Sequence, residues 1–148
     1  GAVHRIAEQD STDFEKAVSR ISAPVILAVG FTGKRMDHTW AVMNSLVRFG
    51  PGRVIVVGEA DCAFAMAQTS KLDLRAGAVV SLVPMREVLG VSSSNLRWPI
   101  KGLTFSPMGQ GGTSNEALGP VEVVFDRTGM IGLVGFKGLP AVMRALET

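Results

Sequence analysis

The sequence predicts an α/β part followed by an all-β part, namely a partial parallel α/β domain and then a small antiparallel β-sandwich. In the first 58 residues, helical patterns alternate with apolar runs at 25–29 and 54–57, an order that favours a parallel sheet. From about residue 72, short apolar runs alternate with Gly, Pro, Ser and Asn turns, as in antiparallel β domains. We therefore expect the character of the chain to change near residue 70.

The first elements are a helix and a buried strand. Apolar residues recur at helical spacing from Phe14 to Ile21, and Pro24 ends that pattern. The run 25–29 is apolar throughout, which predicts a strand covered on both faces.

A second helix and a second strand follow. Trp40, Met43 and Val47 share one helical face, with Val42, Leu46 and Phe49 beside it. Gly50, followed by a proline, stops the helix. The apolar run 54–57 predicts another buried strand. The order helix, strand, helix, strand is the basis for expecting a parallel sheet.

The second half of the chain predicts five strands and a last helix. Residues 59–71 before it fit either a strand or a short helix, and apolar spacing predicts the final helix over 139–146. Glycines recur every third residue from Gly129 to Gly138, which favours a bent or bulged strand with small residues under a neighbour. The expected strands are 78–83, 96–100, 103–105, 121–125 and 130–136.

Composition argues against several classes of protein. Charged residues make up only 19%, the formal charge is +2, and no block of like charges occurs, so we expect no nucleic-acid partner. No apolar run approaches the ~18 residues of a membrane span, and no signal-peptide pattern is present. The lone Cys62 excludes an internal disulfide. We therefore expect a cytoplasmic protein without a membrane partner.

The turn after the first strand carries the most informative polar residues. It places a cation, Arg35, and a carboxylate, Asp37, at a helix start beside a strand end, where open α/β sheets bind ligands. The turn is not a P-loop, because only two residues separate Gly30 from Gly33 and Arg35 follows Lys34. A surface ion pair with a helix cap is the alternative, and both interpretations stay open.

Two further polar clusters have similar alternatives. Residues 9–13 (QDSTD) would either cap a helix or form a magnesium and phosphate corner. Residues 111–116 (GGTSNE) would either form a turn between strands or hydrogen-bond a small heterocycle. Neither a nucleophilic triad nor a zinc pattern is readable in the sequence.

Three segments, in order, resemble those of thiamine pyrophosphokinases. Residues 9–17 (QDSTDFEKA) resemble the family segment D-Q-D-x-T-D-x-x-K-A, and residues 33–39 (GKRMDHT), with Asn44, resemble G-G-R-F-D-H-T. Residues 96–116, which contain LRWPI, LTF and GTSNE, resemble the series G-L-K-W-P-L, L-x-F-G and x-S-N-E. The order and the spacing agree over nearly the whole chain.

The resemblance implies a fold and a reaction. Residues 1–70 would be the C-terminal part of the α/β catalytic domain, and residues 71–148 a β-sandwich thiamine-binding domain with a C-terminal helix. The family works as a homodimer and transfers diphosphate from ATP to the hydroxyl of thiamine, with Mg²⁺, giving thiamine diphosphate and AMP. Such a transfer depends mainly on positioning and charge neutralisation, not on a protein nucleophile.

The resemblance also implies roles for single residues. Asp13 would hold the magnesium ion, Arg35 would meet phosphates, and Asp37 would help to place the thiamine hydroxyl or its metal. The residues that line the nucleotide would be Gln9, Asp10, Thr12 and Arg35. The residues that contact thiamine across the dimer interface would be Thr113, Ser114 and Asn115.

The sequence also departs from the family pattern. Family members carry an earlier stretch with an A-D-G-G-A-N-like segment and an acidic G-D-x-D-S segment, and neither occurs here. We therefore expect a fragment, the C-terminal two-thirds of an enzyme, that is inactive alone. One alternative is a non-catalytic module for thiamine binding and dimerisation, and another is an unrelated nucleotide-binding α/β protein.

Overall fold

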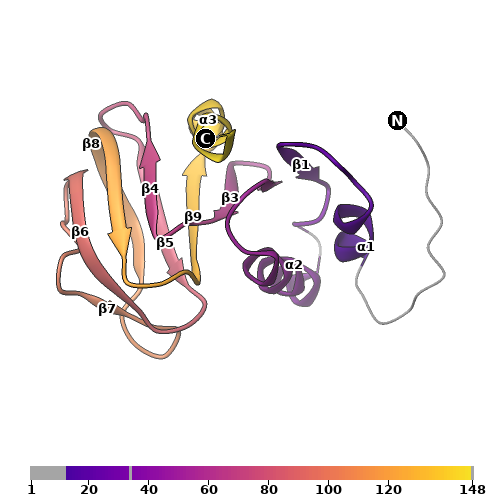
Figure 1. The fold of residues 1–148 in the computed structure, drawn as a ribbon, viewed down its shortest axis with the longest axis horizontal. Helices are drawn as coiled ribbons and strands as arrows, with labels where there is room; N and C mark the ends of the chain where they lie inside the picture. The colour runs from indigo at the N-terminus through magenta and orange to yellow at the C-terminus, as the bar shows by residue number, and fades with distance from the viewer. Residues whose placement is uncertain (1–12, 34, 148) are drawn as a thin grey trace.

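The structure, a computed structural model, describes residues 13–33 and 35–147. Helices and a mixed sheet form the first part and antiparallel strands form the second, which confirms the predicted fold class (Figure 1). In chain order the elements are α1 (Asp13–Ser19), β1 (Ile26–Val29), α2 (Met36–Phe49), β2 (Val54–Val57), β3 (Asp61–Ala65), β4 (Thr69–Leu72), β5 (Val79–Pro84), β6 (Val88–Leu96), β7 (Thr104–Phe105), β8 (Gly112–Phe125), β9 (Met130–Gly135), the 3₁₀ turn η1 (Phe136–Gly138) and α3 (Leu139–Glu147).

One sheet runs through both parts of the molecule. β1 pairs with β2 in parallel, and from β2 the sheet continues through antiparallel β3, β9, β5 and the first part of β8. A second layer is formed by β4, the last part of β8 and β6, with β7 beside β6. β8 therefore belongs to both layers of the sandwich. The predicted domain boundary at residues 70 and 71 lies within β4.

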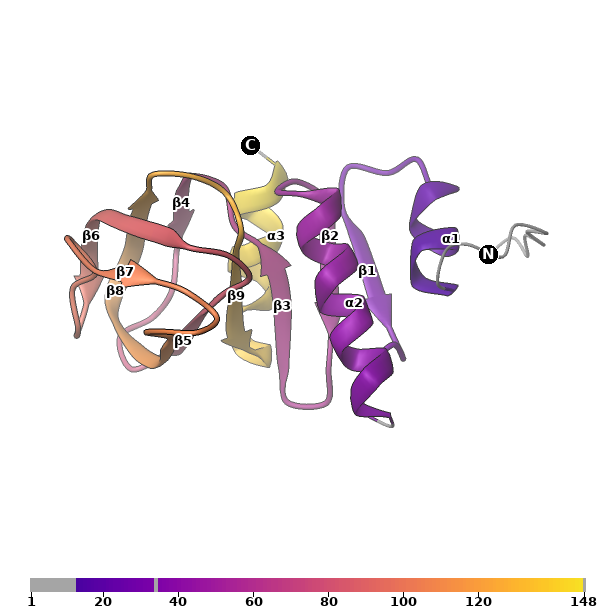
Figure 2. The ribbon, with the colours of Figure 1, turned by 90° about the horizontal axis from the view of Figure 1, so that it is seen from below.

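Two hydrophobic clusters hold the layers together. Helices α1 and α2 cover one face of β1, β2 and β3, where Phe14 and Leu46 are fully buried. The other cluster fills the sandwich and includes Phe64 of β3 and Ala141 and Val142 of α3. Helix α3 lies beside β9 and β3 (Figure 2). In the described part of the chain, no helix is long and apolar enough to cross a membrane.

The prediction that the first strand is covered on both faces is wrong. Ile26 and Ala28 of β1 are buried, but Leu27 is 43% exposed and Val29 is 67% exposed. Helices α1 and α2 lie on one face, and α3 packs into the sandwich cluster without covering Leu27 and Val29. The second strand, β2, is buried at every residue, as predicted.

The helix predicted for α2 and its end are confirmed, and its predicted face is confirmed in large part. Trp40 is 66% exposed, whereas Met43 and Val47 pack against the core and Val42 and Leu46 beside them are buried. Ser45 lies between them, and its hydroxyl donates to Glu15 Oε1 at 2.7 Å, so a polar group is buried with a partner. Gly50 ends the helix at φ +81°, a conformation that glycine adopts without strain.

The first helix is shorter than its apolar spacing predicts. α1 ends at Ser19, so Phe14 and Val18 are buried while Ile21 is 41% exposed. The final helix, α3, is confirmed over the predicted residues.

The predicted strand 96–100 is wrong, because β6 ends at Leu96 and the chain then turns. Pro99 has no backbone N–H to donate to a ladder, and Gly102 takes φ +81°. Residues 59–71 form two strands, β3 and β4. Packing explains Gly132 of the glycine series, because a Cβ there would lie 2.8 Å from Cζ of Phe64, but it does not explain Gly135, where a Cβ would meet nothing within 4 Å.

Candidate functional site

The end of β1, the start of α1 and the start of α2 enclose a pocket of about 440 Å³. Gly30 and Gly33, at φ +86° and +95°, let the chain leave β1 and turn sharply into α2. The pocket is lined by Asp13, Phe14, Gly30, Phe31, Thr32, Arg35, His38, Thr39, Ala41 and Val42. We call it the α/β pocket.

Arg35 and Asp37 form a two-bond ion pair beside the α/β pocket. Nε of Arg35 donates to Oδ1 of Asp37 at 3.1 Å, and its Nη2 donates to Oδ2 at 2.6 Å. The two side chains are 65% and 63% exposed, and exposed pairs contribute only about 0–1 kcal/mol. The guanidinium can therefore exchange its partner for a ligand anion at little cost.

The helix cap expected at this position differs from the prediction. Arg35 is the N-cap of α2, with extended backbone and no capping bond from its side chain. Asp37 lies in the first turn, where its Oδ1 accepts the N–H of His38 at 2.9 Å. The carboxylate therefore partners one of the otherwise unpaired amides of the helix start.

A second pocket, of about 370 Å³, lies between the turn after β6, strand β7 and the start of β8. Gly112 lies on the inner side of β8, where a Cβ would approach Cβ of Leu82 to 3.0 Å and Cε1 of Phe105 to 3.1 Å. The pocket is lined by Trp98, Pro99, Ile100, Leu103, Phe105, Gln110, Gly111, Gly112, Thr113 and Asn115. We call it the β pocket.

A backbone irregularity interrupts β8 beside the β pocket. The pairing register shifts between Val80 and Leu82 of β5, and Ser114 takes φ +62° opposite this shift. The N–H of Ser114 donates to Oγ of Ser81 at 3.0 Å instead of to a strand carbonyl. These features are those of a β-bulge, which re-aims side chains beside it.

Two profiles of one protein family match the chain. Residues 2–57 match the profile described as "Thiamin pyrophosphokinase, catalytic domain", and residues 69–130 match "Thiamin pyrophosphokinase, vitamin B1 binding domain". The chain belongs to the thiamin pyrophosphokinase family. The α/β pocket is built from residues of the first matched region, and the β pocket from residues of the second.

Individual family members agree with this assignment. Thiamine pyrophosphokinase 1 of Oryza sativa subsp. japonica is 30% identical over 124 residues, which are 73% of this chain and 47% of the relative. The thiamin pyrophosphokinase structure from Geobacillus thermodenitrificans matches with a TM-score of 0.71 at 22% identity, covering 87% of this chain and 63% of that one. The structure from Bacillus subtilis matches with a TM-score of 0.71 at 15% identity, covering 86% and 64%. The chain thus spans less than two thirds of these relatives, and the structural matches support the fold.

The family residues predicted from sequence lie in two places. Asp13 and Arg35 line the α/β pocket and Asp37 pairs with Arg35, while Gln9, Asp10 and Thr12 lie outside the described residues. Thr113 and Asn115 line the β pocket, but Ser114 between them does not and is exposed. The thiamin pyrophosphokinase motifs therefore belong to two separate pockets. The elements that build the first, α1, β1 and α2, lie at the opposite end of the molecule from β6, β7 and β8 (Figures 1 and 2).

A metal site is not complete in the described part of the chain. Among residues 13–33 and 35–147, no group of three His, Cys, Asp or Glu side chains could hold a metal ion. Asp13, at the first position of α1, is exposed and is the predicted ligand that falls inside this range. The described residues by themselves do not fit a protein-built magnesium site.

Sequence reasoning missed Trp98 as a residue of the β pocket. Trp98 is 54% exposed, whereas Ile100 and Phe105 of the same pocket are buried. The available signal was an aromatic residue directly before a proline, in a segment that we predicted to be a strand. In a turn, such a ring is free to present one face to a ligand.

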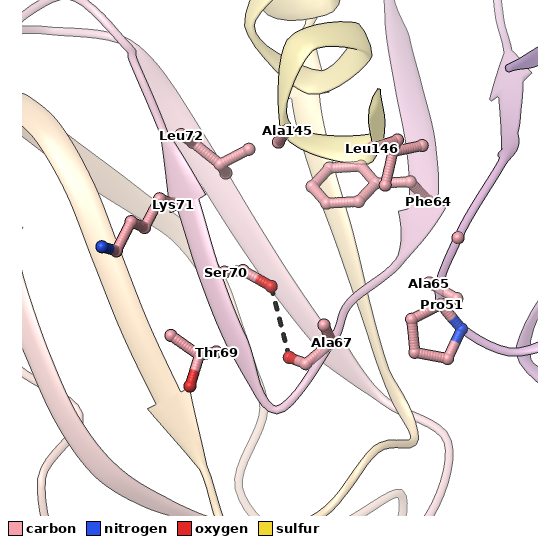
Figure 3. A pocket seen from close by; sticks show the side chains of 11 residues that line it. Pro51, Phe64, Ala65, Ala67, Thr69, Ser70, Lys71, Leu72, Ala145 and Leu146 are labelled. Atoms are coloured by element: carbon pink, nitrogen blue, oxygen red, sulfur yellow. Dashed lines mark hydrogen bonds between the residues drawn. The ribbon is translucent and has the colours of Figure 1, made fainter. Parts of the chain in front are cut away.

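A third pocket, of about 310 Å³, lies between β4 and the end of α3 (Figure 3). Two of its polar side chains already have partners within the chain, because Oγ of Ser70 donates to the carbonyl of Ala67 and Nζ of Lys71 lies 3.6 Å from Oε2 of Glu122. Most of the remaining lining is apolar, with Phe64, Leu72 and Leu146. This pocket carries none of the residues that match thiamin pyrophosphokinase motifs.

Proposed function

We propose that this chain supplies part of the active site of a thiamine pyrophosphokinase, which transfers diphosphate from ATP to the hydroxyl of thiamine. In this reaction the thiamine oxygen forms a bond to the β-phosphorus, the bond between that phosphorus and the α–β bridging oxygen breaks, and AMP leaves. The observation that carries the proposal is the β pocket, where an exposed indole, two short polar side chains and the close-packed Gly112 converge.

The β pocket suits the two rings of thiamine. A pyrimidine needs donors and acceptors at its edge, which Thr113 and neighbouring backbone groups can supply. A thiazolium cation is attracted to the face of an aromatic ring, and the indole of Trp98 offers the strongest such face. We propose that Trp98 stacks on thiamine, that Thr113 and Asn115 form the polar wall, and that Ser114, exposed beside the pocket, also contacts thiamine.

The α/β pocket suits the phosphates of ATP. The start of α2, a 14-residue helix, carries partial positive charge, and Arg35 lies there in an exposed, weakly held ion pair. We propose that a phosphate draws Arg35 away from Asp37, and that the freed Asp37 carboxylate accepts a hydrogen bond from the thiamine hydroxyl. Gln9, Asp10 and Thr12 remain part of the proposed nucleotide site.

Mg²⁺ remains part of this proposal, but we expect few of the described residues to bind it. The ion would neutralise phosphate charge, and Asp13 is the described residue that we expect it to use. A cytoplasmic location is likewise proposed, on the basis of the lone Cys62, which is a free thiol.

We also propose a homodimer joined through the β part. The α/β pocket and the β pocket are built from elements at opposite ends of one chain, so a second copy is needed to bring thiamine to the phosphates (Figures 1 and 2). Val79 of β5 pairs with Glu116 of β8, and Val79 and the nearby Leu118 are 55% and 54% exposed. An apolar patch on this outer face is typical of an interface. Light scattering should return the dimer mass at micromolar concentration, and a monomer mass would count against the proposal.

A thiamine titration by calorimetry tests the function. Wild type should bind, and Ser114→Ala and Asn115→Ala should each weaken binding about 5- to 150-fold, the equivalent of ~1–3 kcal/mol for a lost buried hydrogen bond. If wild type binds and neither substitution changes the affinity, the thiamine site lies elsewhere.

The second candidate is a non-catalytic module for thiamine binding and dimerisation. It is favoured by the incomplete metal site of the described residues. Under either candidate we expect this chain alone to release AMP slowly. Phosphoryl transfer depends mainly on positioning, and we expect this chain alone to place the ATP phosphates poorly. Turnover of about 1 per second or faster, in the ordinary range for enzymes, would contradict that expectation.

A further inference from the structure

The turn that carries Trp98 is held by the side chain of Asn115 on β8. Oδ1 of Asn115 accepts the backbone N–H of Trp98 at 3.2 Å, and its Nδ2 donates to the carbonyl of Trp98 at 2.8 Å. The amide thus binds both backbone groups of one residue, as a neighbouring strand would. Asn115 is only 7% exposed, so water competes little for these bonds.

The hydrogen-bonding capacity of Asn115 is nearly used up inside the chain. Its Oδ1 also accepts the N–H of Glu116 at 2.8 Å, which occupies both lone pairs of that oxygen. One of the two Nδ2–H groups is taken by Trp98. At most one N–H therefore remains for a ligand, whereas a residue that reads a pyrimidine edge directly would keep its acceptor available.

The next residue of β8, Glu116, holds the ring of Trp98 indirectly. Its Oε2 accepts a bond from Nη1 of Arg97 at 3.0 Å, and the guanidinium carbon of Arg97 lies 5.1 Å from the centroid of the Trp98 ring. The backbone N–H of Arg97 also donates to the carbonyl of Glu116 at 2.9 Å. Arg97 thereby lies over one side of the indole, and Trp98, which lines the β pocket, is still 54% exposed.

We propose that Asn115 and Glu116 are positioning residues, which act on thiamine through Trp98 rather than by direct contact. Asn115 fixes the backbone of Trp98, and Glu116 fixes the ring by holding Arg97 against one side. The proposal rests on the proposed function only in taking thiamine as the ligand of the β pocket.

This arrangement also has an electrostatic consequence. A guanidinium on one side of an indole would repel a thiazolium cation on the other side. The carboxylate of Glu116, 3.0 Å from Nη1 of Arg97, offsets that charge. Glu116→Gln should therefore weaken the binding of a cationic ligand more than the binding of a neutral one. Oxythiamine is not a suitable neutral ligand, because it keeps the thiazolium cation. The neutral probe is the aminopyrimidine half of thiamine alone, 4-amino-5-hydroxymethyl-2-methylpyrimidine.

The first experiment needs no ligand. Trp40→Phe leaves Trp98 as the one tryptophan of the chain, so that emission and acrylamide quenching report on the turn. In this background, Asn115→Ala and Glu116→Gln should each red-shift the emission and raise the quenching constant. Ser70→Ala is the matched control, because Ser70 is 9% exposed and also donates to a backbone carbonyl, but away from the turn. Unchanged emission and quenching in both pocket variants would overturn the proposal.

The second experiment is a double-mutant cycle with thiamine, measured by calorimetry on Asn115→Ala, Trp98→Ala and the double variant. If Asn115 acts through Trp98, its substitution should weaken binding about 5- to 150-fold in wild type and change it little once Trp98 is absent. An equal loss in both backgrounds would show direct contact and overturn the proposal.

The two proposals fail in different ways. If wild type does not bind thiamine, the proposed function fails, while the ligand-free fluorescence still decides whether Asn115 and Glu116 hold Trp98. If Asn115→Ala does not fold, Glu116→Gln carries both experiments, with the same expected direction. The Glu116 side chain is 31% exposed and its partner Arg97 is 60% exposed, so this substitution should be tolerated.

Discussion

The left-handed backbone of Ser114 offers a test in which stability and ligand binding should move in opposite directions. Ser114 takes φ +62° within the bulge of β8. A non-glycine residue pays about 1–2 kcal/mol for this conformation. Ser114→Gly removes that strain, while Ser114→Ala retains it, and both remove the same hydroxyl.

The expected magnitude follows from two opposing terms. Glycine loses more conformational freedom on folding, at a cost of about 0.5–1 kcal/mol, so Ser114→Gly should be between unchanged and about 1.5 kcal/mol more stable. For a chain of this size, that difference raises the Tm by about 0–6 °C. Ser114→Ala, at an exposed position, should stay within about 0.5 kcal/mol of wild type.

Thermal unfolding and thiamine titration of the same three proteins complete the test. If the Ser114 hydroxyl contacts thiamine, both variants should lose affinity to a similar extent although one is the more stable protein. Ser81→Ala serves as the control for the bulge itself, because it removes the acceptor of the Ser114 N–H and should cost about 0.5–1.5 kcal/mol. A Ser114→Gly protein that is clearly less stable than Ser114→Ala would refute the strain argument.

Three further predictions concern stability and reactivity. Gly132→Ala should destabilise the sandwich by about 1–3 kcal/mol, because the added Cβ would lie 2.8 Å from Phe64 and 3.0 Å from Met66. Urea unfolding measures this loss, and a stability equal to that of wild type would show that both side chains move aside. The N–H of Leu89 donates to Oδ1 of Asp126 and lowers the pKa of that carboxyl below its ordinary 3.8. The folded state therefore binds fewer protons than the unfolded state, and the stabilisation that the ionised Asp126 contributes is lost as the pH falls through the lowered pKa. The difference in Tm between wild type and Asp126→Ala should therefore shrink in acid, and a constant difference would contradict the assignment. Burial raises the pKa of the Cys62 thiol to about 11, so iodoacetamide should label it slowly in the folded protein at pH 8 and quickly in denaturant; rapid labelling of the folded protein would contradict its burial.

Local sequence patterns predicted which elements form better than which faces they bury. The ends of α2 and the existence of α3 follow from a glycine stop and from apolar spacing. The exposed Leu27 and Trp40 do not follow, because their burial depends on which helix lies over each face of the sheet. Apolar residues alone cannot indicate that β1 is covered on one side.

Candidate site residues could be predicted where family motifs name them. The roles that depend on contacts between residues distant in the sequence could not be predicted. Thr113 and Asn115 line the β pocket, as the motif suggested. The bonds between Asn115 and Trp98 join residues 17 positions apart and depend on a turn that we predicted to be a strand. No local pattern could have indicated that the amide of Asn115 holds the neighbouring aromatic residue.

The central claim, that thiamine binds in the β pocket against Trp98, is tested most directly by a two-dimensional ¹H–¹⁵N NMR titration. The chain has two indole N–H signals, and that of Trp40, 66% exposed on α2 and absent from the lining of both proposed pockets, is an internal control. Thiamine should shift the Trp98 indole signal and the Thr113 and Asn115 backbone amide signals in a saturable manner, and should leave the Trp40 signal in place. Shifts confined to residues around Ser70 and Leu146, in the third pocket, would contradict it.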